Sequence, residues 1–151
     1  MLNIGEKAPL ISGTDQNNNT ISLDQFLGSK VVLYFYPKDS TPGCTAEACN
    51  LRDNYEMLLS QGYKIIGVSP DSVKSHEKFA TKFELPFPLI ADTEKKIVTD
   101  YQVWGEKKFM GRTYMGVFRT TFIIDENGVI ERIISDVDTK NHTEQIINQN
   151  K

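Results

Sequence analysis

The sequence predicts an α/β fold in which a central mixed β-sheet is flanked by helices. Two continuous runs of β-branched and aromatic residues, at 30–36 and 63–69, are typical of strands buried on both faces. Segments with helical spacing follow both runs, and this alternation implies parallel strands joined by right-handed crossovers. Two later strands flank Glu126-Asn-Gly128, which predicts an antiparallel hairpin and therefore a mixed sheet.

The remaining elements follow along the chain. A polar turn predicts a short N-terminal hairpin that extends the fold, built from residues 8–14 and 20–23, and one helical turn follows at 23–27. Apolar residues at helical spacing predict helices over 45–61, 71–83, 93–101 and 141–150, the last capped by Asn141. Further strands are predicted at 89–91, 120–125 and 129–135. Residues 102–117 carry Trp104 and three glycines without a clear period, so we expect a loop with at most one short strand.

The composition is that of an ordinary globular protein and excludes some classes of partner. The 151 residues, expected to form one domain over 1–151, are 39% hydrophobic and 25% charged. The net charge of −3 offers no basic surface for nucleic acid or anionic lipid, and no apolar run approaches the roughly 20 residues that span a membrane. Because the start lacks a signal-peptide pattern, we expect a cytoplasmic protein, whose two cysteines are more often catalytic, redox-active or metal-binding than structural.

Both cysteines lie in one stretch that combines a strand, a stiff turn and a helix start. Thr41-Pro-Gly precedes Cys44 and a helical pattern follows, so Cys44 is predicted in the first helical turn. The thiolate is the nucleophile, and the unpaired N–H groups at a helix start favour it. Thr41 adds a hydroxyl that donates and accepts, while Pro37 and Pro42 stiffen the approach. This clustering favours a reactive thiol over an inert buried cysteine.

Cys49 follows Cys44 by five residues. On an intact helix this spacing is a rotation of about 140° and a rise of about 7.5 Å, which places the two Cα atoms about 8–9 Å apart. A disulfide needs Cα atoms within about 7 Å, so a Cys44–Cys49 bond requires the first turns of the helix to unwind. On spacing alone, Cys49 fits a packed helix cysteine equally well.

At these residues the sequence resembles the peroxiredoxins. Pro37-x-x-x-Thr41-x-x-Cys44 is similar to their active-site signature, and the longer run from Phe35 to Cys49 resembles the bacterioferritin comigratory protein, or peroxiredoxin Q, branch. The similarity continues in order and spacing over nearly the whole chain, at Gly67-Val-Ser-Pro-Asp-Ser-Val, Leu89-Ile-Ala-Asp, Trp104-Gly-Glu-Lys-Lys and Arg119-Thr-Thr-Phe-Ile-Ile-Asp.

The resemblance implies a thioredoxin-like fold and a thiol peroxidase that reduces hydrogen peroxide and organic hydroperoxides. Cys44 matches the peroxidatic cysteine, Thr41 the hydroxyl that orients the peroxide, and Pro37 the shielding proline. Arg119 matches the distal arginine, and Cys49 matches the resolving cysteine, which implies a disulfide recycled by thioredoxin or a similar dithiol. The resemblance implies no metal or organic cofactor. Members of this branch are often monomeric, but the sequence does not exclude a dimer.

Other residues receive weaker assignments. Glu47 also matches the family pattern, and we interpret it as a partner of the helix dipole or of an arginine, not as a proton shuttle. His76 and His142 fall on predicted helices and are expected at the surface or in packing. The aromatic run Tyr34-Phe-Tyr36 is expected in the core. An apolar collar near the site and simple loop packing are equally good interpretations of Trp104, Phe109, Met110 and Met115.

Two other functions fit parts of the pattern. A disulfide oxidoreductase of the thioredoxin type fits the order of elements, but the chain has no Cys-x-x-Cys pair and no proline after Pro88 for the cis-proline of such sites. A metal-binding or holdase module is the other alternative, although two thiols and two distant histidines make a poor zinc site by spacing.

Overall fold

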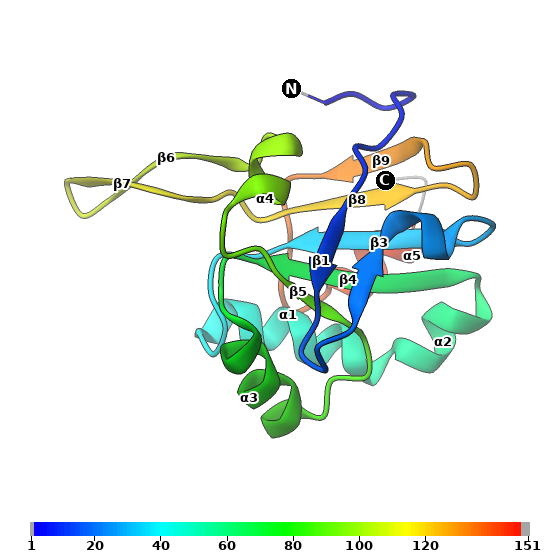
Figure 1. Cartoon of the computed structure of the whole chain (residues 1–151), viewed down its shortest axis with the longest axis horizontal. Helices are drawn as coiled ribbons and strands as arrows, with labels where there is room; N and C mark the ends of the chain where they lie inside the picture. Colours follow the sequence, from blue (N-terminus) through cyan, green and yellow to red (C-terminus); the bar gives the residue numbers. More distant parts are fainter. Residues whose placement is uncertain (1, 149–151) are drawn as a thin grey trace.

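The computed structural model describes residues 2–148 and has a five-stranded mixed sheet at its centre (Figure 1). The strands lie in the order β5-β4-β3-β8-β9, with the bounds β3 Lys30–Phe35, β4 Tyr63–Ser69, β5 Leu89–Ala91, β8 Thr120–Ile124 and β9 Ile130–Ile134. The β3–β4 and β4–β5 pairs are parallel, and the β3–β8 and β8–β9 pairs are antiparallel. The predicted mixed sheet is confirmed, and Gly128 takes a φ of 80° in the predicted hairpin turn.

Helices and a small hairpin cover the two faces of the sheet. One face carries α1 Pro42–Asp53, α2 Tyr55–Ser60, α3 Val73–Phe83 and α5 His142–Ile147. The other carries β1 Ser12–Thr14, β2 Thr20–Ser22, the 3-10 turn η1 Leu23–Phe26 and α4 Lys96–Asp100. The predicted N-terminal hairpin is therefore confirmed, and it closes one side of the core. Among residues 2–148, no helix combines the length and apolar character needed to cross a membrane.

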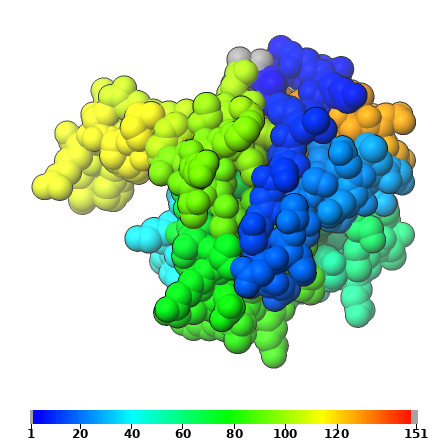
Figure 2. Space-filling view, viewed as in Figure 1, coloured from blue at the N-terminus to red at the C-terminus, as the bar shows by residue number. Residues whose placement is uncertain are grey.

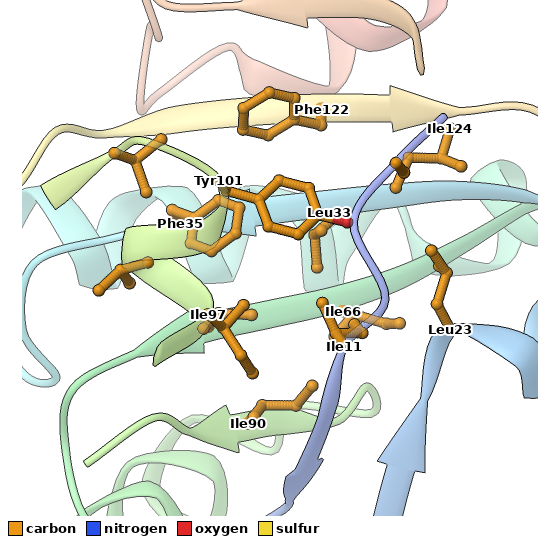
Figure 3. Packing of buried hydrophobic residues seen from close by; sticks show 14 of the residues in the cluster. Ile11, Leu23, Leu33, Phe35, Ile66, Ile90, Ile97, Tyr101, Phe122 and Ile124 are labelled. Carbon is orange, nitrogen blue, oxygen red and sulfur yellow. The ribbon is translucent and has the colours of Figure 1, made fainter. Parts of the chain in front are cut away.

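Side chains alternate along β3 between two apolar clusters. Val31, Leu33 and Phe35 face the cluster beneath the N-terminal hairpin and α4, where Figure 3 shows Phe35 beside Tyr101 and Phe122. The other side chains of β3, with Tyr36 beyond its end, pack against α1, α2, α3 and α5, in the cluster that also holds Cys44. The expectation that Tyr34-Phe-Tyr36 lies in the core is confirmed.

Three predicted helices have different boundaries in the structure. The single helix over 45–61 is wrong, because Asn54 adopts φ −111° and ψ 14° and separates α1 from α2. The helix predicted at 93–101 shrinks to α4, since Lys95 takes a left-handed φ of 61° just before it. The last helix ends at Ile147, and residues 149–150 of the prediction lie outside the described residues. Asn141 stands at its N-cap position without capping it, because the Asn141 amide donates to Asp138.

The segment 102–117, predicted as a loop, is instead an antiparallel ribbon. Strands β6 Trp104–Phe109 and β7 Arg112–Val117 project from the body of the protein (Figures 1 and 2). Met110 and Gly111 form the turn with φ values of 52° and 78°. Much of the ribbon is solvated on both faces, so burial imposes no hydrophobic alternation that a sequence pattern would reveal.

The projection of the ribbon also determines how exposed its large apolar side chains are. Phe109, Met110 and Met115 are exposed, so loop packing is wrong for these three. Trp104, at the base of the ribbon, is half-buried against the cluster that contains Phe122 and Tyr101. The packing interpretation therefore holds for Trp104 alone.

Candidate active site

The end of β3 leads directly into the site. Because β3 is paired on both edges, its backbone is fixed up to Phe35, and the N–H of Tyr36 still donates to the carbonyl of Val68 at 3.1 Å. The chain then turns, and Ser40 adopts a φ of 63°, which is uncommon for a residue other than glycine. Thr41 is the N-cap residue of α1, with a proline at the first helical position, where the missing N–H has no cost. The turn places Cys44 in the first turn of α1, as predicted.

The thiol of Cys44 is buried and faces the guanidinium of Arg119. Only 2% of Cys44 is exposed, and Arg119 Nη2 donates to its Sγ at 3.4 Å. A Cβ at Gly43 would meet the same Nη2 at 3.2 Å, so the glycine leaves room for the guanidinium. Burial lowers the pKa of Arg119, but the charges of Cys44 and Glu47 more than offset this and raise it overall. A permanent cation and the first turn of a helix therefore both border the Cys44 sulfur.

Thr41 and Pro37 lie on the loop that carries this turn. The Thr41 hydroxyl donates to the carbonyl of Lys38 at 2.9 Å and does not cap α1. The N–H groups of the first helical turn are therefore left without a side-chain cap, and the hydroxyl oxygen keeps its capacity to accept. Pro37 is half-buried directly after the strand and contributes no N–H of its own.

Glu47 is fully buried one turn after Cys44 and pairs with the same arginine. Arg119 Nη1 donates to Glu47 Oε1 at 2.8 Å, which confirms the interpretation of Glu47 as an arginine partner. Burial raises the pKa of Glu47 to about 7, although the charge and the hydrogen bond of Arg119 oppose the shift. A carboxyl group that changes its charge near neutral pH thus lies beside the guanidinium that contacts the thiol.

Both histidines are buried, so the alternative of a surface position is wrong for each of them. His142, on α5, lies 2.8 Å from the Thr121 hydroxyl through Nε2 and 2.8 Å from Gln145 Oε1 through Nδ1. His76, on α3, lies 2.7 Å from Asp39 Oδ2 through Nδ1. Helical spacing placed both residues on the right elements, but it carries no information about these distant partners.

Asp39 anchors the loop that leads to α1, and the sequence reasoning missed it. Its carboxylate accepts from the hydroxyls of Tyr36 and Ser75 at 2.6 and 2.7 Å and from His76. Its N–H donates to Asp71 Oδ2 at 2.8 Å. Within residues 2–148, Asp39, Asp71 and His76 are the one group close enough to hold a metal ion, and it includes neither cysteine. Protein donors already occupy these oxygens, so the cluster is better explained as a structural clamp.

Cys49 is half-buried on the same unbroken helix as Cys44, and both are free thiols. Helix geometry keeps their Cα atoms about 8–9 Å apart, beyond disulfide range. The neighbouring Asn50 is fixed to the start of α5, because its Oδ1 accepts from the N–H and hydroxyl of Thr143 at 2.8 and 2.7 Å. Its Nδ2 donates to the carbonyl of Lys140 at 2.9 Å. Any unwinding of α1 that brings the two cysteines together is therefore confined to the segment between two fixed points, Asp39 and Asn50.

The ribbon brings a second cation toward the thiol. Lys107 Nζ donates to the carbonyl of Val117 at 2.9 Å, and its stem crosses Gly116, where a Cβ would meet the lysine Cδ at 3.0 Å. Burial and the charge of Arg119 lower the pKa of Lys107, while the charge of Cys44 opposes this. The ammonium group is therefore within electrostatic reach of both site residues. Lys107 belongs to the Trp104-Gly-Glu-Lys-Lys motif, for which the sequence alone predicted no role.

An apolar cavity of about 350 Å³ borders the site at Arg119. Much of its lining, including Tyr101, Val103 and Phe122, belongs to the cluster on the opposite face of the sheet from Cys44. Arg119, which contacts the thiol, also lines this cavity.

Comparison with known proteins places this geometry in a family. Residues 4–133 match the AhpC/TSA family. The chain belongs to the AhpC/TSA family. It is 42% identical to peroxiredoxin Bcp of Escherichia coli over 147 residues, which cover 97% of this chain and 94% of that protein. It is 43% identical to peroxiredoxin Bcp of Bacillus subtilis over 146 residues, which cover 97% and 93%.

Solved structures agree with this assignment. Peroxiredoxin Q of Xanthomonas campestris matches with a TM-score of 0.86 and 32% identity, covering 92% of this chain and 88% of that one. A cysteine-to-serine mutant of Xylella fastidiosa PrxQ matches with a TM-score of 0.92 and 29% identity, covering 99% and 95%. The thioredoxin-like fold is confirmed by these matches, and the chain is a peroxiredoxin of the Bcp type.

Proposed function

We propose that this peroxiredoxin reduces hydrogen peroxide and organic hydroperoxides with Cys44 as its nucleophile. The observation that carries the proposal is the buried Cys44 thiol in the first turn of α1, with Arg119 Nη2 at 3.4 Å from its sulfur. A similar protein, the Xanthomonas campestris bacterioferritin comigratory protein, has been studied for its alkyl peroxide reduction activity. Attack on a peroxide needs a thiolate and donors for the departing oxygen, and this site supplies both.

In the first step, the Cys44 thiolate attacks one oxygen of the hydroperoxide. A sulfur–oxygen bond forms, the O–O bond breaks, and the departing oxygen leaves with the electron pair and takes up a proton as water or an alcohol. The Thr41 hydroxyl and the N–H groups of the first helical turn hold the peroxide oxygens, Pro37 shields them, and Arg119 stabilises the developing negative charge. Cys44 ends the step as a sulfenic acid.

In the second step, Cys49 resolves the sulfenic acid. Its sulfur attacks the sulfur of Cys44, water leaves, and a disulfide forms. Because α1 separates the two residues in the reduced form, this step needs the helix to unwind between Thr41 and Cys49. A thioredoxin-type dithiol then reduces the bond by exchange. We place this cycle in a monomer in the cytoplasm, where such dithiols are kept reduced.

Rapid mixing with hydrogen peroxide tests the chemistry. Reduced wild-type protein consumes peroxide and gains an intramolecular disulfide, whereas Cys44→Ser lowers the rate by more than about 10³-fold. Cys49→Ser reacts at the wild-type rate but accumulates a species heavier by one oxygen, which mass spectrometry detects. A Cys44→Ser variant as fast as wild type would overturn the assignment of Cys44. Insulin reduction that outpaces peroxide consumption would instead favour a disulfide oxidoreductase.

A further inference from the structure

The β6–β7 ribbon carries exposed aromatic side chains on one of its faces. Successive side chains of a strand point to opposite faces, and directly paired residues of an antiparallel ribbon share a face. Phe109 pairs with Arg112 and Lys107 with Tyr114, so these four side chains lie on the same face. Phe109 is 64% exposed and Tyr114 is 46% exposed. Exposed apolar side chains that gather on one surface, unlike scattered ones, mark a site of interaction.

Two paired glycines extend this face to the base of the ribbon. Gly105 lies directly opposite Gly116, on the same face as Tyr114. The Phe118 ring lies 2.7 Å from where a Cβ on Gly105 would stand, and the Tyr114 ring lies 3.3 Å from such an atom on Gly116. Phe118 is itself 42% exposed. The aromatic face, formed by Phe109, Tyr114 and Phe118, therefore runs from the tip of the ribbon to its base.

The aromatic face begins beside the reactive cysteine. Phe118 immediately precedes Arg119, whose guanidinium donates to the Cys44 sulfur at 3.4 Å. Lys107, on the same face, donates to the carbonyl of Val117 at 2.9 Å, next to Phe118. Strands of six residues extend roughly 17–20 Å from this point, and the ribbon projects from the body of the protein (Figure 2). A molecule that covers this face and also reaches the cysteines must have the size of a protein.

The charges on the ribbon indicate which protein fits it. Residues 104–117 contain Lys107, Lys108 and Arg112 but one acid, Glu106, whereas the whole chain has a net charge of −3. A second copy of this chain would bring like charges together on the two ribbons. Anionic lipid would attract the ribbon but repel the acidic remainder of the chain. A partner with an acidic rim around an apolar patch complements both the cations and the aromatic rings.

We propose that the aromatic face of the β6–β7 ribbon is the docking surface for the protein that reduces this peroxiredoxin. The partner is a dithiol protein with an apolar patch and an acidic rim beside its reactive thiol. This inference rests on the proposed function, which requires a thioredoxin-type dithiol but assigns it no binding surface.

Docking on this face brings the partner thiols to the oxidised cysteines. One partner thiolate attacks a sulfur of the Cys44–Cys49 disulfide, the S–S bond breaks, and the other sulfur leaves as a thiolate. The second partner thiolate then attacks the mixed disulfide, and the partner is oxidised to its own disulfide. Cys44 and Cys49 are both reduced and take up the two protons that the partner thiols release.

Reduction by two dithiols of different size tests the docking surface. The protein is oxidised with an equimolar amount of hydrogen peroxide and mixed with reduced thioredoxin or with dithiothreitol, and mass spectrometry of quenched samples follows the loss of the Cys44–Cys49 bond. Phe109→Ser combined with Tyr114→Ser should slow reduction by thioredoxin about tenfold, because aromatic anchors carry much of the energy of an interface. Reduction by dithiothreitol, which is too small to need the ribbon, should keep the wild-type rate.

Two further variants test the face and the charge separately. Met115 is exposed on the opposite face of β7, where it pairs with Glu106, so Met115→Ser should leave both reduction rates unchanged. Arg112→Glu should slow reduction by thioredoxin at low salt and weaken its dependence on salt, because rim charges act mainly on the rate of encounter.

The outcomes distinguish this proposal from the proposed function. A protein that forms no disulfide with peroxide overturns the proposed function, and this inference with it. If the disulfide forms, the docking surface is wrong when thioredoxin fails to reduce the wild type or reduces the double variant equally fast. Equal slowing by Met115→Ser, or equal slowing of the dithiothreitol reaction, also overturns it. Self-association or binding to anionic vesicles that the double variant abolishes, with an unchanged thioredoxin rate, would assign the face to that occupant instead.

Discussion

Removal of the Asp39 carboxylate should loosen the active-site loop and cost several kcal/mol of stability. This carboxylate accepts from three donors, the hydroxyls of Tyr36 and Ser75 and Nδ1 of His76, at 2.6–2.7 Å. His76 Nε2 lies 3.0 Å from the carbonyl of Ile90. The side chains of His76 and Asp39 are 0% and 3% exposed, so Asp39→Ala leaves the buried groups around this carboxylate without their partner.

The expected loss follows from that burial. Breaking a buried pair by removing one partner costs about 3–5 kcal/mol, whereas replacing both partners by apolar residues is often close to neutral. Asp39→Ala is therefore expected to lower the free energy of unfolding by about 3–5 kcal/mol, and Asp39→Ala with His76→Leu to recover at least about 1–2 kcal/mol of this loss. Ser75→Ala removes one donor only and should cost about 1 kcal/mol.

Urea unfolding followed by circular dichroism measures these differences, and rapid mixing with peroxide measures the effect on the site. Because Thr41 and Pro37 lie on the anchored loop, both Asp39→Ala variants should also lose roughly tenfold or more in the rate of peroxide consumption, compared with Ser75→Ala. A loss of unfolding free energy below about 1 kcal/mol for Asp39→Ala would refute the interpretation of Asp39 as a structural clamp, as would a double variant less stable than the single one.

Two further predictions concern the second cation and the far end of α1. Lys107→Met should lower the rate of peroxide consumption by roughly three- to tenfold at low salt, because it removes a cation within reach of the thiolate, while Lys108→Met on the alternate face of β6 keeps the wild-type rate. Equal stopped-flow rates for the two variants contradict this. Asn50→Ala should lower the free energy of unfolding by about 1–3 kcal/mol, because it leaves the buried Thr143 without its acceptor. Hydrogen exchange should then accelerate in α1 more than in α3, and equal changes in both helices count against the anchor.

Local sequence patterns were sufficient where burial or turn chemistry leaves a mark on consecutive residues. The continuous apolar runs identified β3 and β4 because strands covered on both faces have no polar side. Asn127-Gly128 located the β8–β9 turn because a glycine adopts positive φ without strain. The motif around Cys44 placed this thiol at a helix start for the same local reason, since proline and glycine constrain the turn before it.

Local patterns failed at positions where neither burial nor turn chemistry constrains consecutive residues. Much of the β6–β7 ribbon is solvated on both faces, so no alternation of apolar and polar residues separates it from a loop. The break at Asn54 was missed because the apolar spacing continues across it from α1 into α2.

The sequence by itself determined that a thiol at a strand–turn–helix junction is the reactive centre, because the residues that create this junction are neighbours in the chain. Only the tertiary structure decided what surrounds the thiol. Arg119 reaches Cys44 from 75 residues away, and His76 reaches Asp39 from 37 residues away. His142 approaches Glu47 only because α5 packs against α1 through Asn50. Such contacts depend on how helices and strands stack, and their charges couple only because packing excludes the water that would otherwise screen them.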